Sequence, residues 1–117
     1  MEELLEEWQK RLGLTDWVIS LYEDCEPSDF SDQAVGETEF TESCRCAVIR
    51  ILAPKYYGTR VKPYDGEKTL VHELLHLKLS LVAYQVSDLQ ERYMHQIIDD
   101  LARAFVYAKR RGKKNDD

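Results

Sequence analysis

The residues with the clearest capacity for chemistry form a single short motif, His72-Glu73-Leu74-Leu75-His76. On a helix, residues four apart lie one turn above each other, so the imidazoles of His72 and His76 can reach one metal ion. Glu73 is about 100° round the helix from His72, too far to complete the ligand set but near enough to touch a metal-bound water. The spacing therefore predicts a zinc site with an adjacent carboxylate.

This arrangement predicts hydrolysis of a peptide bond. Zinc lowers the pKa of its bound water from 15.7 to about 7, a carboxylate removes the proton, and the hydroxide attacks a carbonyl that the metal also polarises. We therefore expect Glu73 to be the catalytic base. The alternative is that two histidines and a glutamate stand in a core helix by chance. It is disfavoured because so apolar a helix should not bury three such groups without a partner.

A catalytic zinc usually takes a third protein ligand and keeps one position for water. The next helix places a continuous stripe at spacings of four, four, three and four residues, made up of Glu91, His95, Asp99, Ala102 and Val106. We favour His95 as the third ligand, with Asp99 one turn later orienting its imidazole through a hydrogen bond. Glu91 is the alternative, since it would give the commoner set of two histidines and one glutamate.

The elements that must position these residues follow from periodicity and from turn signals. We expect an N-terminal helix ending near Gly13, three strands, an irregular connection, and two helices, of which the second begins with the capping box Ser87-Asp88-Leu89-Gln90. The expected helices span 2–12, 67–84 and 87–109, and the expected strands span 17–22, 35–41 and 44–52. This order predicts an α+β fold with a small, mostly antiparallel sheet of about three strands.

Composition places the chain among ordinary globular domains. Its 117 residues are 44% hydrophobic and 32% charged, which predicts a single domain over 1–117. Apolar runs fall short of the roughly 20 residues that cross a bilayer, and the acidic start is unlike a secretory signal, so we expect a cytoplasmic protein. The three cysteines, Cys25, Cys44 and Cys46, are interpreted as reduced thiols.

Charge is unevenly distributed along the chain. Residues 1–43 hold 13 acids and 2 bases, while the whole chain carries a net charge of −6. The basic tail over about 109–117 is interpreted as a solvated helix end, because basic groups there complement the helix dipole. We therefore do not expect a nucleic-acid partner, and we expect a monomer whose partner is a peptide or protein substrate.

The sequence resembles the small zincin-like metallopeptidases, which include the minigluzincins and related short proteins of phages and bacteria. The resemblance rests on Leu70-Val71-His72-Glu73-Leu74-Leu75-His76-Leu77, on the strand over 47–51 before it, and on Asp99-Asp100-Leu101-Ala102-Arg103-Ala104-Phe105 after it. In that group the third ligand is generally a glutamate, with an acidic or amide residue one turn later. If Asp99 matches that later residue, His95 takes the ligand position, and a set of three histidines is more like that of the SprT-like zincins.

The resemblance also implies where a substrate would bind. In zincins the strand before the active helix forms the edge of the sheet and the upper rim of the cleft. Here that role would fall to residues 45–51, with Cys46, Ala47, Val48, Ile49 and Arg50 as the substrate strand. An exposed strand edge can pair with an extended peptide and hold its carbonyl near the metal.

Two functions of different classes remain open at this point. The first is a zinc metallopeptidase, a hydrolase with one Zn²⁺ per chain. The second is a metal-stabilised binding or regulatory module without catalysis, which would follow if Glu91 and His95 both bound zinc and so closed the coordination shell.

Overall fold

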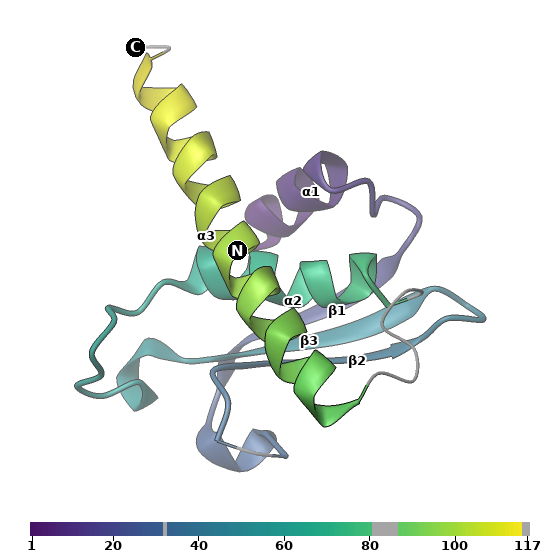
Figure 1. Cartoon of the computed structure of the whole chain (residues 1–117), viewed down its shortest axis with the longest axis horizontal. Helices are drawn as coiled ribbons and strands as arrows, with labels where there is room; N and C mark the ends of the chain where they lie inside the picture. The colour runs from purple at the N-terminus through teal and green to yellow at the C-terminus, as the bar shows by residue number, and fades with distance from the viewer. Residues whose placement is uncertain (32, 81–86, 116–117) are drawn as a thin grey trace.

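The computed structural model describes residues 1–31, 33–80 and 87–115, and the side chains up to residue 112. Within them the chain forms three α-helices, three β-strands and two short 3₁₀ helices (Figure 1). Their bounds are α1 (Glu2–Arg11), β1 (Val18–Cys25), β2 (Gly36–Thr41), β3 (Cys46–Leu52), α2 (Gly66–Lys78) and α3 (Asp88–Asn115), with 3₁₀ turns at Pro27–Asp29 and Pro54–Tyr56. The α+β class expected from the sequence is confirmed.

The sheet is mixed, so the expectation of a mostly antiparallel sheet was wrong. Its order is β1-β3-β2, with β1 parallel to β3 and β2 antiparallel to β3. A tight turn joins β2 to β3, in which Arg45 takes a positive φ of 51° and donates its N–H to the Glu42 carbonyl. Such a hairpin makes consecutive strands antiparallel neighbours. The longer connection after β1 instead carries the chain across to the far side of the sheet.

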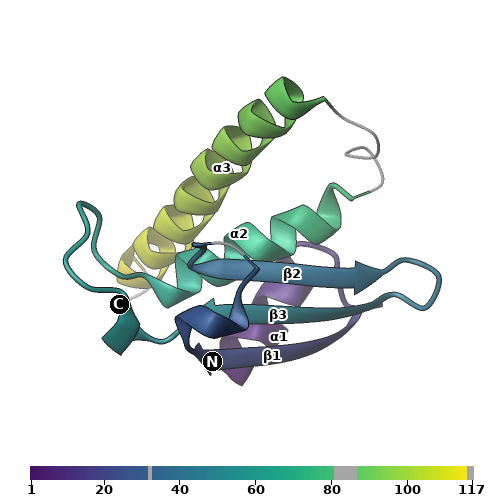
Figure 2. The same cartoon turned by 90° about the horizontal axis from the view of Figure 1, so that it is seen from below.

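This topology corrects the strand assigned to the substrate. Residues 46–50 belong to β3, which pairs with β1 on one side and with β2 on the other. Both of its edges are therefore occupied, and it cannot add a further strand. The outer strand on the side of α2 is β2, and Figure 2 shows β2 lying along that helix.

One face of the sheet carries the core. Ala47, Ile49 and Ile51 alternate along β3 and are buried against the helices, as the period of two in a strand requires. Helix α2 supplies five buried apolar residues to this core, namely Leu70, Val71, Leu74, Leu75 and Leu77. The helix is therefore central to the fold.

Several predicted helix ends are confirmed, and others differ from the prediction. Gly13 stops α1 in the left-handed region with φ 69°. Reciprocal bonds between the backbone and side chains of Ser87 and Gln90 form the expected capping box at 3.0 and 3.2 Å. By contrast α2 ends at Lys78, six residues before the expected limit, and residues 81–84 of the expected helix lie outside the described residues.

The basic segment at the end of α3 is partly buried, which corrects its interpretation as a solvated tail. The side chain of Lys109 is 3% exposed and pairs with Glu67 on α2 and with Glu7 on α1, the latter at 3.1 Å. Arg110 bonds both carboxylate oxygens of Asp65 at 3.0 Å. We call these five residues the ion-pair cluster. The cluster holds α3 near its end against α1 and α2, and α3 continues to Asn115.

No described helix has the length and apolar character needed to span a bilayer.

Candidate metal centre and active site

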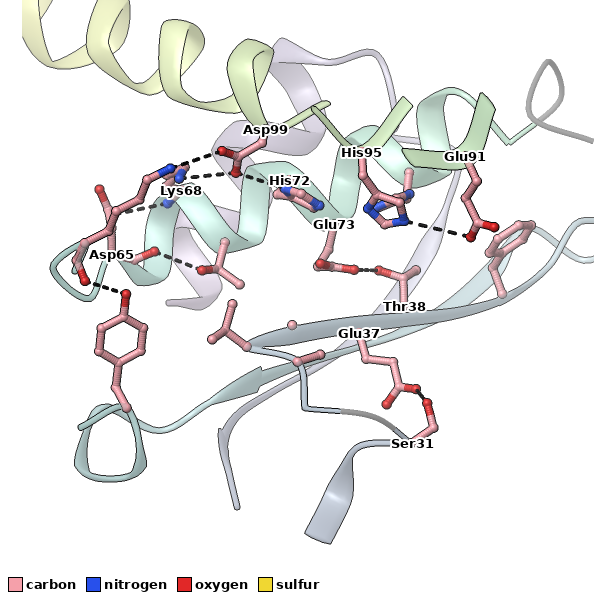
Figure 3. Close-up of a pocket in the computed structure, with 18 of the residues that line it drawn as sticks. Ser31, Glu37, Thr38, Asp65, Lys68, His72, Glu73, Glu91, His95 and Asp99 are labelled. Atoms are coloured by element: carbon pink, nitrogen blue, oxygen red, sulfur yellow. Dashed lines mark hydrogen bonds and ion pairs between the residues drawn. The ribbon is translucent and has the colours of Figure 1, made fainter. Parts of the chain in front are cut away.

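Three imidazoles meet where α2 and α3 pack side by side. His72 and His76 come from consecutive turns of α2, and His95 reaches them from α3 (Figure 3). Ring centroids lie 5.0 Å apart for His72 and His76, and 4.7 Å apart for His76 and His95. One ligand nitrogen from each ring lies within 4.8 Å of the others. The structure thus brings together the three residues that the sequence nominated as ligands.

The spacing of these nitrogens fits a zinc ion after small side-chain rotations. With zinc–nitrogen bonds of about 2.0–2.1 Å and tetrahedral angles, two ligand nitrogens stand roughly 3.3 Å apart. Nitrogens no more than 4.8 Å apart leave a point within about 2.8 Å of all three. Imidazole nitrogen is also a preferred zinc ligand. The donor set therefore suits zinc in both chemistry and reach.

The two histidines of α2 are held in the neutral form that a metal needs. Burial, together with the neighbouring charges of His72 and His95, lowers the pKa of His76 to about 4. Burial also lowers the pKa of His72, although Asp99 opposes this shift. A neutral imidazole keeps a nitrogen lone pair available near pH 7.

Asp99 lies beside His72, whereas the sequence led us to expect it beside His95. Its Oδ1 is 3.4 Å from His72 Nδ1, at the outer limit of a hydrogen bond, and 3.2 Å from Lys68 Nζ. α3 runs antiparallel to α2. A residue one turn after His95 in the sequence therefore lies beside a part of α2 that is nearer the start of that helix, towards Lys68. A proton on His72 Nδ1 donated to Asp99 would leave Nε2 free for the metal.

Glu91 lies at the rim of the three-imidazole group and does not belong to it. Its Oε1 is 3.9 Å from His95 Nε2, and its side chain is 60% exposed. The geometry thus favours His95 over Glu91 as the third ligand, in the order that the sequence suggested.

Glu73 turns from the helix towards the sheet, below the imidazoles (Figure 3). It is 6% exposed, and Thr38 Oγ1 on β2 donates a hydrogen bond of 2.7 Å to its Oε1. Burial raises the pKa of Glu73 to about 7, with a smaller upward contribution from Glu37 and an opposing one from Thr38. The proposed base is therefore fixed in position by the outer strand of the sheet.

Two residues of β2 were missed by the sequence reasoning. Besides Thr38, Gly36 lies so close to α2 that an added Cβ would come within 2.9 Å of Glu73 Oε2 and 2.7 Å of Thr69 Cγ2. The signal in the sequence was slight, namely small residues at alternating positions 36 and 38, which share one face of a strand. Neither residue type carries chemistry that would have drawn attention to it.

All of these groups line one open cleft of about 1010 Å³ between β2, α2, α3 and the connection before α2. The three histidines, Glu73 and Thr38 occupy its middle. Towards the start of α2 the lining includes Arg60, Lys62 and Lys68 together with Asp65 and Asp99, and Asp99 pairs with both lysines. Towards the β2–β3 turn it includes Phe40, Glu42 and Glu91. The cleft is large enough to hold an extended peptide segment.

Comparison of the chain with models of protein families, with curated proteins and with solved structures finds no match.

Proposed function

We propose that the protein is a zinc-dependent peptidase. The observation that carries this proposal is the convergence of His72, His76 and His95 within 4.8 Å in the same cleft as the buried carboxylate of Glu73. Three protein ligands leave one position of a tetrahedral shell open, which is the pattern of catalytic rather than structural zinc. When bound, zinc would supply a Lewis acid that polarises a carbonyl and lowers the pKa of a coordinated water.

The residues of the chain would divide the remaining work. Glu73 would accept the proton of the attacking water, and Thr38 would hold its carboxylate in one orientation through Oε1. Because Gly36 has no side chain, it leaves space beside Oε2 of Glu73, and a larger residue would occupy that space. Asp99 would fix the ring of His72 through Nδ1.

The substrate would lie along β2, which replaces the central strand β3 in this role. β2 is an outer strand, and an extended peptide can add to the edge of such a strand. A peptide antiparallel to β2 would direct its C-terminal side towards Arg60, Lys62 and Lys68, and its N-terminal side towards Glu42 and Glu91.

Replacing Glu73 by Gln tests the proposal. The amide keeps the shape of the carboxylate but cannot accept the proton, so hydrolysis of a library of internally quenched peptides should fall by about 10² to 10⁴. Zinc content, measured by elemental analysis, should stay near one per chain. Glu6→Gln is the matched control, because it changes an exposed carboxylate on α1, outside the cleft, and should leave turnover unchanged.

A second candidate, a metal-stabilised binding module, is favoured by the hydrogen bond between Thr38 and Glu73. A glutamate that is almost fully buried and bonded to the sheet could serve only to fasten α2 to β2. In that case the wild-type protein should bind zinc but cleave no peptide in the library, and Glu73→Gln should change only the melting temperature.

A further inference from the structure

The turn between β2 and β3 carries two exposed thiols. Cys44 lies in the turn and Cys46 is the first residue of β3, and both are free and exposed. The third cysteine, Cys25, is free but buried at the end of β1. Figures 1 and 2 show the β2–β3 turn projecting from the end of the sheet. A reagent in solution can therefore reach both thiols of the turn.

The backbone of the turn brings Cys44 and Cys46 close together. Arg45, the residue between them, has a φ of 51°, in the left-handed region. Helical dihedrals of either hand hold the Cα atoms of the two flanking residues about 5.5 Å apart, whereas an extended strand separates them by about 6.6 Å. Disulfides most often join Cα atoms about 5.5–6 Å apart. The backbone of the reduced turn is thus already suited to a disulfide.

The two side chains also adjoin each other. The sulfur of Cys46 lies 3.4 Å from the carbonyl oxygen of Cys44, and the sulfur of Cys44 lies 3.8 Å from the carbonyl oxygen of Thr41. Interaction with the side chain of Cys44 is the largest of the effects that raise the pKa of the Cys46 thiol. Because this interaction joins the two side chains directly, the thiols are neighbours in space as well as in the sequence.

Contacts with the segment before β1 hold the turn in this shape. The carbonyl of Arg45 accepts a hydrogen bond of 2.9 Å from the N–H of Val18, and its guanidinium pairs with Asp16. The N–H of Arg45 donates to the carbonyl of Glu42 at 3.2 Å. The fold therefore orders the turn before any bond forms between the sulfurs, and groups held in place in this way react faster than free ones.

We propose that Cys44 and Cys46 are a redox-active pair that a small-molecule disulfide converts to an intrachain disulfide. The thiolate of Cys44 attacks one sulfur of the reagent, which forms a mixed disulfide and releases a first thiolate. The thiolate of Cys46 then attacks Cys44 Sγ and releases a second one. The two released thiolates take up the two protons that Cys44 and Cys46 lose. Two protein thiols are oxidised and one reagent disulfide is reduced, so electrons and protons balance.

The disulfide of this pair should be reversible. Bonding between cysteines with one residue between them closes a small ring, and strained or exposed disulfides are the readily reduced ones that serve regulatory or catalytic roles. Excess dithiothreitol should therefore restore both thiols. The pair lies outside the three-histidine group, and its redox chemistry is independent of the proposed peptidase function.

Counting thiols in the full chain after treatment with oxidised glutathione tests the pair. The free thiols of the unfolded wild type should fall from three to one, and its intact mass should show no attached glutathione. Cys46→Ser is the matched variant, because it removes the second attacking thiol and should leave one glutathione attached to Cys44. A wild-type protein that keeps three thiols, or that accumulates attached glutathione as Cys46→Ser does, would overturn the proposal.

Tryptic mapping tests which sulfurs are joined. Trypsin cleaves after Arg45, between the two cysteines, so a disulfide between them would link residues 12–45 to residues 46–50. Cys25→Ala leaves Cys44 as the only cysteine of the longer peptide, and free thiols are alkylated before digestion. Dithiothreitol should separate the linked peptides, and a non-reducing gel should show a single chain. Absence of the linked peptide, or a linked dimer on the gel, would contradict the proposed pair. The thiol count on the wild type does not depend on the Cys25→Ala background.

Discussion

The packed pair of α2 and α3 is held by different chemistry at its two ends. At one end the ion-pair cluster sets the carboxylates of Glu67, Asp65 and Glu7 against Lys109 and Arg110. At the other end three imidazoles, His72, His76 and His95, face one another. Between the two ends, Asp99 of α3 contacts Lys68 and His72 of α2.

The two ends differ in whether their own side chains compensate one another's charge. Opposite charges in the ion-pair cluster compensate one another, and Trp8 Nε1 adds a hydrogen bond of 2.8 Å to Glu67. Three imidazoles cannot compensate one another in this way, since all would be cationic when protonated and all offer a lone pair when neutral. The first end is therefore complete without a ligand, while the second is suited to a cation. The same pair of helices thus separates a structural site from a candidate functional one.

Removal of one imidazole should have the largest effect and act only at the metal end. The free energy of zinc binding at a structural site with four protein ligands is about 10–16 kcal/mol, or roughly 3 to 4 kcal/mol for each ligand. We expect a similar contribution from each histidine here. His76→Ala and His95→Ala should therefore weaken zinc binding by a factor of about 100 to 1000, measured by competition with a chromophoric chelator. Gln96→Ala, beside His95 on the exposed surface of α3, should bind zinc as the wild type does.

Chelation of zinc should also lower the melting temperature of the wild type but not of His76→Ala, because a ligand that binds only the native state stabilises it. Equal melting curves with and without chelator for the wild type would contradict a site that bridges the two helices.

Lys109→Ala should have the next largest effect and act at the ion-pair end. Its side chain is almost fully buried against Glu67 and Glu7, so truncation leaves carboxylates without their main partner and should cost about 3 kcal/mol of unfolding free energy. Urea denaturation would measure this loss. Arg111→Ala, at the exposed neighbouring position, should change stability by less than about 0.5 kcal/mol.

Lowering the pH provides the control for the claim that Lys109 stabilises the protein through its ion pairs. Although burial opposes the shift, Lys109 and Arg110 hold the pKa of Glu67 below its ordinary value, and Arg110 does the same for Asp65. Carboxylates with a lowered pKa in the folded state stabilise the protein above the unfolded pKa of about 4, and this contribution is lost as pH falls further. The stability difference between the wild type and Lys109→Ala should therefore shrink below about pH 4. A constant difference would mean that Lys109 acts through packing alone.

Asp99→Ala tests whether the carboxylate of Asp99 orients the ring of His72. Asp99 contacts both His72 and Lys68, so its loss should free the ring of His72 without removing a ligand. Zinc affinity should fall by about 10- to 100-fold, the usual effect of losing a residue that orients a ligand. Asp99→Asn should recover part of the affinity, since an amide oxygen can still accept the His72 proton. An Asp99→Ala protein with full affinity would show that this contact, at 3.4 Å, contributes nothing.

The sequence predicted those features that depend on local spacing. A separation of four residues along one helix fixes the relation of His72 to His76, and the reciprocal bonds of Ser87 and Gln90 span a separation of only three residues. The spacing of Glu91, His95 and Asp99 by four residues likewise identified His95. These arrangements are set within one or two helical turns, so periodicity was sufficient.

Features that depend on contacts between distant elements were not predictable in the same way. Asp99 was assigned to His95 because both lie on one helix, but the antiparallel packing of α2 places it beside His72 instead. The strand order could not be read from the strands themselves, and so β3 was taken for an edge. Lys109 looked solvated because its partners, Glu7 and Glu67, stand 102 and 42 residues away in the sequence. Each error concerns a pairing that only the tertiary fold defines.

Glu91→Ala should have the smallest effect. Glu91 lies next to the three histidines without being one of the proposed ligands. Its carboxylate is largely exposed, and its distance of 3.9 Å from His95 Nε2 is longer than a hydrogen bond. An exposed ion pair of this kind contributes about 0 to 1 kcal/mol, so zinc affinity should change by less than about fivefold. The same chelator competition used for His95→Ala measures it. If Glu91→Ala loses zinc while His95→Ala retains it, the third ligand is the carboxylate, and α3 must rotate on binding metal to bring Glu91 towards His72 and His76.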